Sequence, residues 1–136
     1  MARLRPYLFF NGNCREAIEF YHSTFGGKLE LQTVGESPMA TSMPPETHKN
    51  VLHAALFIKE DFCIFASDSM MGKVDHGGTV SLCFECESKE EIDSLFAKLS
   101  EDGKVNHPLS EEFFGTMGDL TDKYGFNWML EFSAKQ

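Results

Sequence analysis

The apolar and polar positions of the chain repeat in the same order at two places. Residues 8–25 alternate as a short strand and continue as an amphipathic helix, and sliding the sequence by 74 positions places the same pattern at residues 82–99. In each unit, apolar residues recur at helical spacing and predict one buried stripe. The stripes comprise Cys14, Ile18, Tyr21 and Phe25 in the first helix, and Ile92, Leu95, Phe96 and Leu99 in the second. We interpret the units as a repeat, and two unrelated strand-helix units are the alternative.

End signals flank both helical stretches. The pairs with capping-box spacing are Asn13 with Glu16 and Ser88 with Glu91. The glycines that suit the left-handed turn after a helix are Gly26, Gly27 and Gly103. The sequence therefore predicts helices over residues 14–25 and 88–100.

Alternating or continuously apolar segments predict eight strands. They cover residues 4–10, 28–34, 51–58 and 62–67 in the first half, and 79–86, 104–109, 115–120 and 126–132 in the second. We expect a single α+β domain over residues 1–136. It contains two βαβββ modules, at about 1–68 and 79–136, and a linker at 69–78. A helix should cover one face of each curved, antiparallel or mixed sheet, and the opposite faces should form a cup.

Residues 35–50 contain three Pro and no periodic pattern. A segment of this length in a compact domain is typically a binding lid or a mobile surface loop. Both interpretations stay open, although Met39 and Met43 would give a lid apolar groups to lay over a pocket.

Composition narrows the classes of partner. The net charge of −9 argues against binding to nucleic acid or to anionic membranes, which require clustered Lys and Arg. No apolar run is long enough to cross a bilayer, and the N-terminus lacks the pattern of a signal peptide, so a cytoplasmic protein with four reduced Cys is expected. The thirteen Phe indicate a core or a pocket rich in rings.

Strand alternation predicts which side chains face the cup. The residues expected to pack beneath the helices are Leu8, Phe10, Leu52, Ala54, Leu56, Ile58, Val80, Leu82 and Phe84. The residues expected on the cup face are Tyr7, Phe9, His53, Ala55, Phe57, Thr79, Ser81 and Cys83. A single His is often a hydrogen-bonded structural residue, but His53 could also serve as a base, an acid or a substrate anchor.

Other residues carry weaker signals. Cys83 and Cys86 have CxxC spacing, but on a strand they point to opposite faces, which disfavours a zinc or redox site. Asp68 is expected to be a turn residue, and Trp128 to pack under a helix. Phe113 and Phe114 either close the mouth of the cup or belong to the core.

The order of several segments resembles one family along nearly the whole chain, from about Pro6 to Phe132. The segments are PYLFFNGNCREAIEFYHSTFGGKLE, VLHAALFI, FASDSM and FFGTMGDLTDKYGFNWMLEF. They look like the PhnB-like branch of the vicinal oxygen chelate superfamily, which also contains glyoxalase I, bleomycin-resistance proteins and extradiol dioxygenases. The resemblance implies paired βαβββ modules that form a cup and, commonly, a homodimer.

Metal-using members of that superfamily place His, Glu or Gln ligands on the first and last strands of each module. The matching positions here are Tyr7 or Pro6, Phe65, Thr79 and Met129. None of these suits a divalent cation, so no metal or other cofactor is predicted, although a divalent metal is not excluded. Glu131 is either a displaced ligand or a solvated carboxylate.

Two hypotheses about function follow. The first is a protein that binds a small apolar or aromatic molecule without transforming it. Its expected ligand-binding residues are Tyr7, Phe9, His53, Phe57, Phe65, Ser81, Phe114 and Met129. The second is a lyase- or isomerase-type enzyme with His53 as base and a metal or Tyr7 as electrophile, or with His53 as a displaced metal ligand. Some PhnB-like proteins are labelled ubiquinone-pathway methyltransferases, but no Gly-rich turn after a strand indicates a methyl-donor site. A dimeric scaffold without a pocket is the third possibility.

Overall fold

The structure, a computed structural model, describes residues 3–59, 62–70 and 72–133. The chain divides into two compact units, one ending at Val74 and the other beginning at Asp75. Each unit contains one of the predicted βαβββ modules, and we call them module one and module two. The predicted α+β class with paired βαβββ modules is confirmed.

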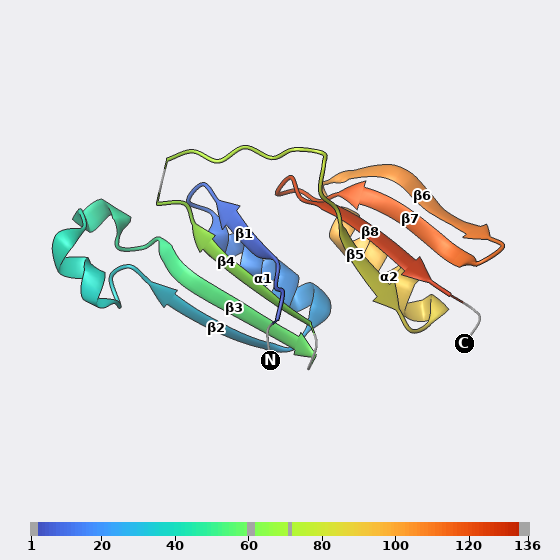
Figure 1. Ribbon diagram of the computed structural model, residues 1–136, viewed down its shortest axis with the longest axis horizontal. Helices are drawn as coiled ribbons and strands as arrows, with labels where there is room; N and C mark the ends of the chain where they lie inside the picture. The colour runs from blue at the N-terminus through green and yellow to red at the C-terminus, as the bar shows by residue number, and fades with distance from the viewer. Residues whose placement is uncertain (1–2, 60–61, 71, 134–136) are drawn as a thin grey trace. The chain divides into compact units, whose positions relative to one another are not determined.

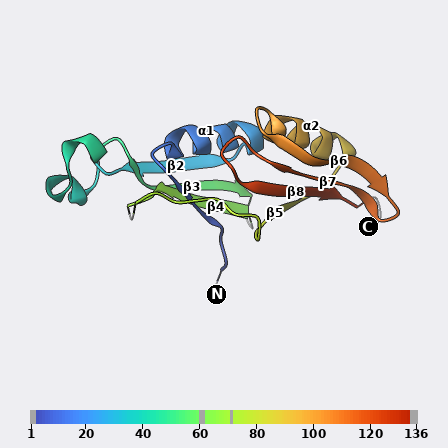
Figure 2. The same ribbon diagram turned by 90° about the horizontal axis from the view of Figure 1, so that it is seen from above.

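Module one is a four-stranded mixed sheet with one α-helix on one face (Figures 1 and 2). Its elements are β1 (Tyr7–Phe10), α1 (Cys14–Phe25), β2 (Lys28–Thr33), the 3-10 helices η1 (Pro38–Ser42) and η2 (Pro45–Thr47), β3 (Val51–Lys59) and β4 (Phe62–Asp68). The strand order is β1-β4-β3-β2, and only the β1–β4 pair is parallel. Glu60 and Asp61, which follow β3 and precede β4 in the sequence, lie outside the described residues.

Module two repeats this arrangement. Its elements are β5 (Leu82–Cys86), α2 (Lys89–Ser100), β6 (Lys104–Glu112), β7 (Gly115–Thr121) and β8 (Asn127–Phe132). The order β5-β8-β7-β6 is that of module one, with a parallel β5–β8 pair and antiparallel neighbours. The repeat seen in the apolar pattern therefore corresponds to a repeat of topology.

Both cores lie between a helix and its sheet. The fully or nearly buried residues of module one include Leu8, Phe10, Cys14, Ala17, Ile18, Tyr21, Ala54, Leu56, Ile64 and Ala66. Those of module two include Phe84, Ile92, Leu95, Phe96, Leu99, Leu120, Trp128 and Leu130. The predicted stripes are thus buried as expected, except that Phe25 is only half-buried and packs edge-on against Phe62. The prediction for Trp128 is confirmed.

The start of β5 differs from the prediction. Residues 79–81 precede the strand, and Val80 is 70% exposed instead of packing beneath α2. The carbonyl groups of Gly77 and Val80 accept hydrogen bonds from the Asn127 side-chain amide, at 2.9 and 3.3 Å. The backbone at Gly77 and Val80 is therefore bound by a side chain, whereas the alternating pattern predicted that a strand begins at residue 79.

The two helix N-termini are capped in different ways. At α2, the Ser88 hydroxyl accepts from the Glu91 N–H at 3.0 Å, as predicted, while the Glu91 carboxylate accepts from the N–H of Glu87 instead of Ser88. At α1, the prediction was wrong: Asn13 makes no side-chain capping bond. The carboxylate of Asp68 takes that role from the end of β4.

Asp68 is buried, not the surface turn residue expected from the sequence. Its Oδ1 accepts from the N–H groups of Gly12 and Cys14 at 2.9 and 3.0 Å, and its Oδ2 accepts from the N–H of Val51 at 2.8 Å. One carboxylate therefore joins the β1–α1 turn, the first residue of β3 and the end of β4.

The C-terminal turns also differ. Gly26 and Gly27 adopt positive φ angles of 77° and 90° after α1, as predicted. After α2, the left-handed residue is Asp102 (φ 59°) and not Gly103. A Cβ on Gly103 would collide with the backbone of Thr121 and Asp122, so this glycine is required for close approach of two chain segments.

Residues 35–50 form an ordered segment built on η1 and η2. Nε2 of His48 lies 3.0 Å from the Ala40 carbonyl and 3.1 Å from the Met43 carbonyl, and the Ser37 hydroxyl caps η1 by accepting from the Met39 N–H. Because both partners of Nε2 are acceptors, this nitrogen must carry a proton. The role of this segment as a lid stays a prediction.

The four Cys are free and differ in exposure. Cys14 is fully buried beside Asp68, and burial, with a smaller contribution from the Asp68 charge, raises the pKa of its thiol from 9.0 to about 12. Since the unfolded thiol ionises near pH 9, burial of neutral Cys14 favours the folded state fully below that pH. This contribution to stability is lost as the pH rises from 9 to about 12.

We expect a thiol reagent such as DTNB at pH 8 to label native protein only at Cys83, the one exposed Cys among the described residues. All four thiols should react in urea. The Cys83→Ser variant should then be inert while folded, and Cys86→Ser should react like the wild type. Rapid labelling of folded Cys83→Ser protein would contradict the buried position of the other thiols.

Candidate functional site

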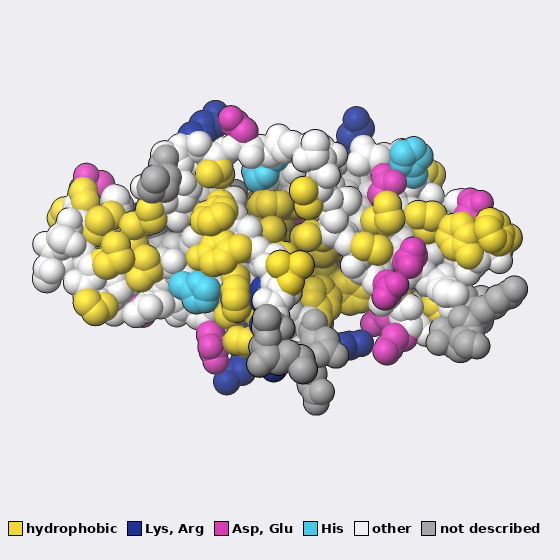
Figure 3. Space-filling view, viewed as in Figure 1, with side chains coloured by type: hydrophobic (Ala, Val, Ile, Leu, Met, Phe, Trp, Pro, Cys, Tyr) yellow, Lys and Arg dark blue, Asp and Glu magenta, His cyan; other side chains and the backbone are white. Residues whose placement is uncertain are grey.

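The face of the module one sheet opposite α1 carries a cluster of aromatic side chains. Strand pairing places Tyr7 beside Phe65, and Phe65 beside Ala55, so these residues project to the same side. Phe9 follows Tyr7 at the next position of that side and is 48% exposed, while Tyr7 is 40% exposed. Hydrophobic side chains gather over this sheet in the space-filling view (Figure 3).

His53 lies within this cluster. The Tyr7 and Phe9 rings stack at 4.8 Å between centroids, and the Phe65 ring lies 6.2 Å from Tyr7 and 5.2 Å from His53. The Tyr7 hydroxyl is 3.4 Å from Nδ1 of His53, a long hydrogen bond. We call these four residues, Tyr7, Phe9, His53 and Phe65, the aromatic face.

Phe57 lies on the same side, two positions beyond Ala55 on β3 and paired with Lys28 and Cys63. Its ring is partly exposed, whereas Ala54 and Leu56 on the opposite side are fully buried. The parity predicted for β3 is therefore correct, and five of the eight expected binding residues share one sheet face: Tyr7, Phe9, His53, Phe57 and Phe65.

Arg5 was not among the binding residues expected from the sequence. This residue precedes β1 in the sequence. Its guanidinium carbon lies 5.6 Å from the centre of the Phe65 ring. Arg5 has the same parity as Tyr7 and Phe9, and extending that alternation by two positions would have found it. The cation therefore borders the aromatic face.

The other expected binding residues belong to module two. Ser81 is exposed and precedes β5, and Met129 is half-buried in β8. The strand neighbour of Met129 on β5 is Cys83, and the expected ligand position Thr79 precedes this strand, which begins at Leu82. Cys83 is exposed and Cys86 buried, which agrees with their predicted placement on opposite faces.

The side of the module two sheet opposite α2 is acidic. Glu131 of β8 pairs directly with Glu85 of β5. Asp119 of β7, opposite Met129, has a carboxylate oxygen 3.0 Å from Nδ1 of His107. Burial and then the charges of Glu131 and Glu85 raise the pKa of the Cys83 thiol. Glu131 thus has a carboxylate as its strand neighbour.

The residues at the superfamily's ligand positions do not fit a divalent metal. Tyr7 and Phe65 are strand neighbours, but a phenol and a phenyl ring offer no imidazole or carboxylate. Across residues 3–59, 62–70 and 72–133, no group of three or more His, Cys, Asp or Glu side chains is arranged to hold a metal ion.

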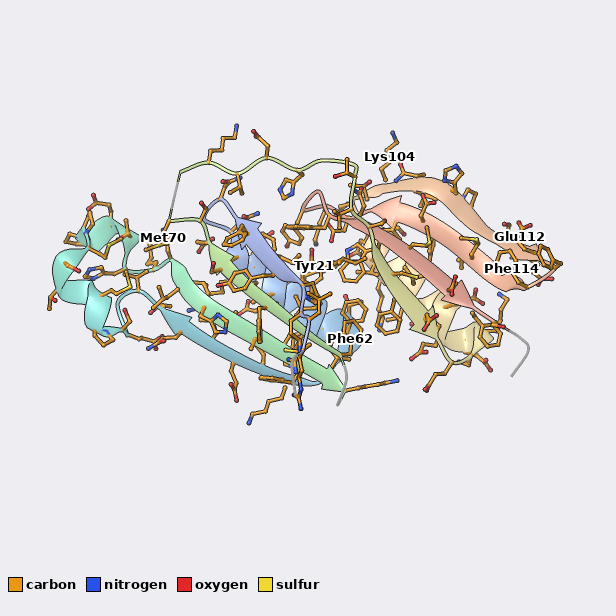
Figure 4. All side chains as sticks on the ribbon, in the orientation of Figure 1. Tyr21, Phe62, Met70, Lys104, Glu112 and Phe114 are labelled. Carbon is orange, nitrogen blue, oxygen red and sulfur yellow. The ribbon has the colours of Figure 1, made fainter. Side chains whose placement is uncertain are left out.

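Phe114 lines a separate pocket of about 280 Å³ in module two, at the turn between β6 and β7. Figure 4 labels Phe114 and Glu112 at that end of the hairpin. Phe113 is 94% exposed, so the core-packing interpretation of this residue was wrong, and its ring contacts Phe114 edge-on at 5.2 Å. Lys89, Glu111 and Phe132 complete most of the wall.

No helix in the described part of the chain has the length and apolar character needed to span a bilayer. Residues 2–131 match the family described as 3-demethylubiquinone-9 3-methyltransferase. The chain is 34% identical to protein PA1353 from Pseudomonas aeruginosa, with a TM-score of 0.86 and 98% of each chain covered.

Two further solved structures are similar. The putative 3-demethylubiquinone-9 3-methyltransferase, PhnB protein, from Bacillus cereus is 29% identical, with a TM-score of 0.79 over 97% of this chain and 100% of that one. A glyoxylase/bleomycin resistance protein/dioxygenase domain from Frankia sp. EAN1pec shares the fold at 13% identity, with a TM-score of 0.67 over 99% of this chain and 94% of that one. Since the family match spans nearly all of the sequence, the chain belongs to the 3-demethylubiquinone-9 3-methyltransferase family, and it shares its fold with the glyoxylase/bleomycin resistance protein/dioxygenase domain.

Proposed function

We propose that this protein binds a small aromatic molecule on the aromatic face of module one. The observation that carries the proposal is the exposure of stacked Tyr7 and Phe9 next to His53 on a sheet face whose opposite side is fully packed. Exposed aromatic rings gathered around one titratable group are typical of ligand sites, in which burial supplies affinity and a few polar atoms supply orientation.

The side chains of the face have distinct roles in this proposal. Phe9 and Tyr7 offer ring surfaces for stacking, and Phe65 is the half-buried floor between Tyr7 and His53. When Tyr7 donates its hydroxyl proton to Nδ1 of His53, the neutral imidazole carries its own proton on Nε2. That N–H can then donate to an oxygen atom of the ligand.

A matched pair of probes tests the proposal. We expect 2-naphthol, which carries a hydroxyl, to bind more tightly than naphthalene, measured by probe fluorescence and competition. Phe9→Ala should weaken both probes about tenfold, because a lost stacking contact costs about 1–1.5 kcal/mol. His53→Ala should remove the preference for 2-naphthol and leave the far-UV circular dichroism unchanged, because a side chain on the exposed face supports none of the helix-facing core.

Leu4→Ala is the control variant, since Leu4 is almost fully exposed and lies before β1. It should bind both probes like the wild type. Absence of binding by the wild type, or equal losses in Phe9→Ala and Leu4→Ala, would refute the proposed site.

The contact between Tyr7 and His53 supports a second candidate, an enzyme in which His53 acts as general base. The family is described as a methyltransferase family, so the reaction would be a methyl transfer. His53 would take the proton of a ligand hydroxyl while the hydroxyl oxygen attacks the methyl group of a sulfonium donor. The donor would then leave as a thioether. Mass spectrometry of catechol recovered after incubation with S-adenosylmethionine separates the candidates. A methylated product supports the enzyme, and unchanged catechol supports the binding protein.

Assembly as a homodimer stays a proposal. Its support is that β1 and β2, the edge strands of the module one sheet, have unpaired outer edges within their own sheet, and pairing with a second copy is a common way to cover such edges.

A further inference from the structure

The aromatic face has a permanent positive charge at its border. The guanidinium of Arg5 lies over the Phe65 ring at 5.6 Å, and the His53 ring lies 5.2 Å from the same Phe65 ring. Phe65 is therefore the common neighbour of a cation, an imidazole and the Tyr7 phenol. An arginine side chain remains charged at every pH at which the protein is folded.

Within the described residues, no carboxylate lies within ion-pair distance of Arg5, whereas Arg15, Lys28 and Lys89 each have such a partner. Among the described residues, the Arg5 guanidinium contacts the face of the Phe65 ring. Its hydrogen-bond donors remain open to an anion.

We infer that the ligand of this site is a small aromatic carboxylate, with the carboxylate on Arg5 and the ring on the aromatic face. A planar guanidinium binds a carboxylate through two parallel hydrogen bonds, and its position at the edge of the ring cluster suits an acid group attached directly to a flat ring system. A hydroxyl at the opposite end of the same ring system would reach toward His53. This inference rests on the proposed function and adds the chemical class of the ligand.

The simpler interpretation of the same geometry is that Arg5 only shields Phe65 from water. The two interpretations differ in their response to a negative charge on the ligand. Shielding predicts equal affinity for neutral and anionic probes, or weaker binding of the anion because the protein carries a net charge of −9. Recognition by Arg5 predicts a preference for the anion.

The test compares 6-hydroxy-2-naphthoate with 2-naphthol, which share the ring and the hydroxyl and differ in the carboxylate. We expect the wild type to bind the carboxylate at least tenfold more tightly. Arg5→Gln should abolish this preference, so that the two probes bind with equal affinity. Arg3→Gln is the matched control, because it removes the same charge two residues earlier in the chain and should keep the preference.

Each outcome has a defined meaning. Equal binding of both probes by the wild type would overturn the inference and leave the proposed function intact. Loss of the preference in both Arg variants would show a general charge effect and also overturn it. If the wild type binds neither probe, the proposed function itself fails. Far-UV circular dichroism and the melting temperature of each variant establish that the fold is retained.

Discussion

Replacing Asp68 by Ala should lower the free energy of unfolding of module one by about 4 kcal/mol. The substitution removes the acceptor of three backbone N–H groups, those of Gly12, Cys14 and Val51. Two of these donors, the N–H groups of Cys14 and Val51, are buried, and each left without an acceptor costs about 1–3 kcal/mol. Helix α1 also loses a negative charge at its N-terminus. Urea unfolding followed by far-UV circular dichroism measures the change.

The matched control for this prediction is Asn13→Ala. Asn13 stands where a local cap is expected but makes no side-chain capping bond, so its loss should cost less than about 0.5 kcal/mol. Asp68→Asn should also be strongly destabilising, because an amide has only one acceptor oxygen where two carboxylate oxygens are used. A larger cost for Asn13→Ala than for Asp68→Ala would show that the cap is local after all.

Asp122→Ala should have the second-largest effect, about 3 kcal/mol on module two. Oδ1 of Asp122 accepts from the N–H groups of Tyr124 and Phe126 at 2.9 and 3.0 Å, and Oδ2 accepts from Nε1 of Trp128 at 2.8 Å. Both Asp122 and Trp128 are buried, so water cannot readily replace the carboxylate. The turn between β7 and β8 and the largest side chain of the core would lose their common partner.

Trp128 is the only Trp of the chain, so its fluorescence reports the unfolding of module two. Asp119→Ala is the control, because the Asp119 side chain is 28% exposed and its partner His107 is mostly exposed. An ion pair of this kind contributes about 0–1 kcal/mol. Equal shifts of the urea midpoint in the two Asp variants would contradict the structural role of Asp122.

The helices, and the sheet face to which the strand side chains point, could be predicted from the sequence. Both features depend on the spacing of apolar residues that are close together in the chain. The stripe from Ile92 to Leu99 repeats every three or four positions, and only one face of a helix can bury it. The alternation along β3 likewise placed His53 and Phe57 opposite Ala54 and Leu56. The resemblance along the chain then gave the topology that joins these elements.

The N-terminus of α1 is a place where the pattern of neighbouring residues predicted the wrong capping group. Asn13 and Glu16 have the spacing of a capping box, but the first turn of α1 is instead bound by Asp68, more than fifty positions later in β4, which accepts from the N–H groups of Gly12 and Cys14. The Asp68 carboxylate comes near the N-terminus of α1 only when the sheet has formed. A pattern of neighbouring residues therefore cannot predict this capping contact. The late start of β5 has a similar cause, since Asn127 binds the backbone at Val80.

The candidate site also has features that the sequence predicted and features that only the tertiary structure shows. The sequence by itself determined the two βαβββ modules, their helices and the sheet side of Tyr7, Phe9 and His53, because periodicity depends only on neighbours along the chain. Only the tertiary structure placed the Tyr7 hydroxyl against His53, Arg5 over Phe65, and Asp68 under three amide groups. These contacts join residues far apart in sequence, and their geometry depends on strand register and on side-chain packing, which no periodic pattern encodes.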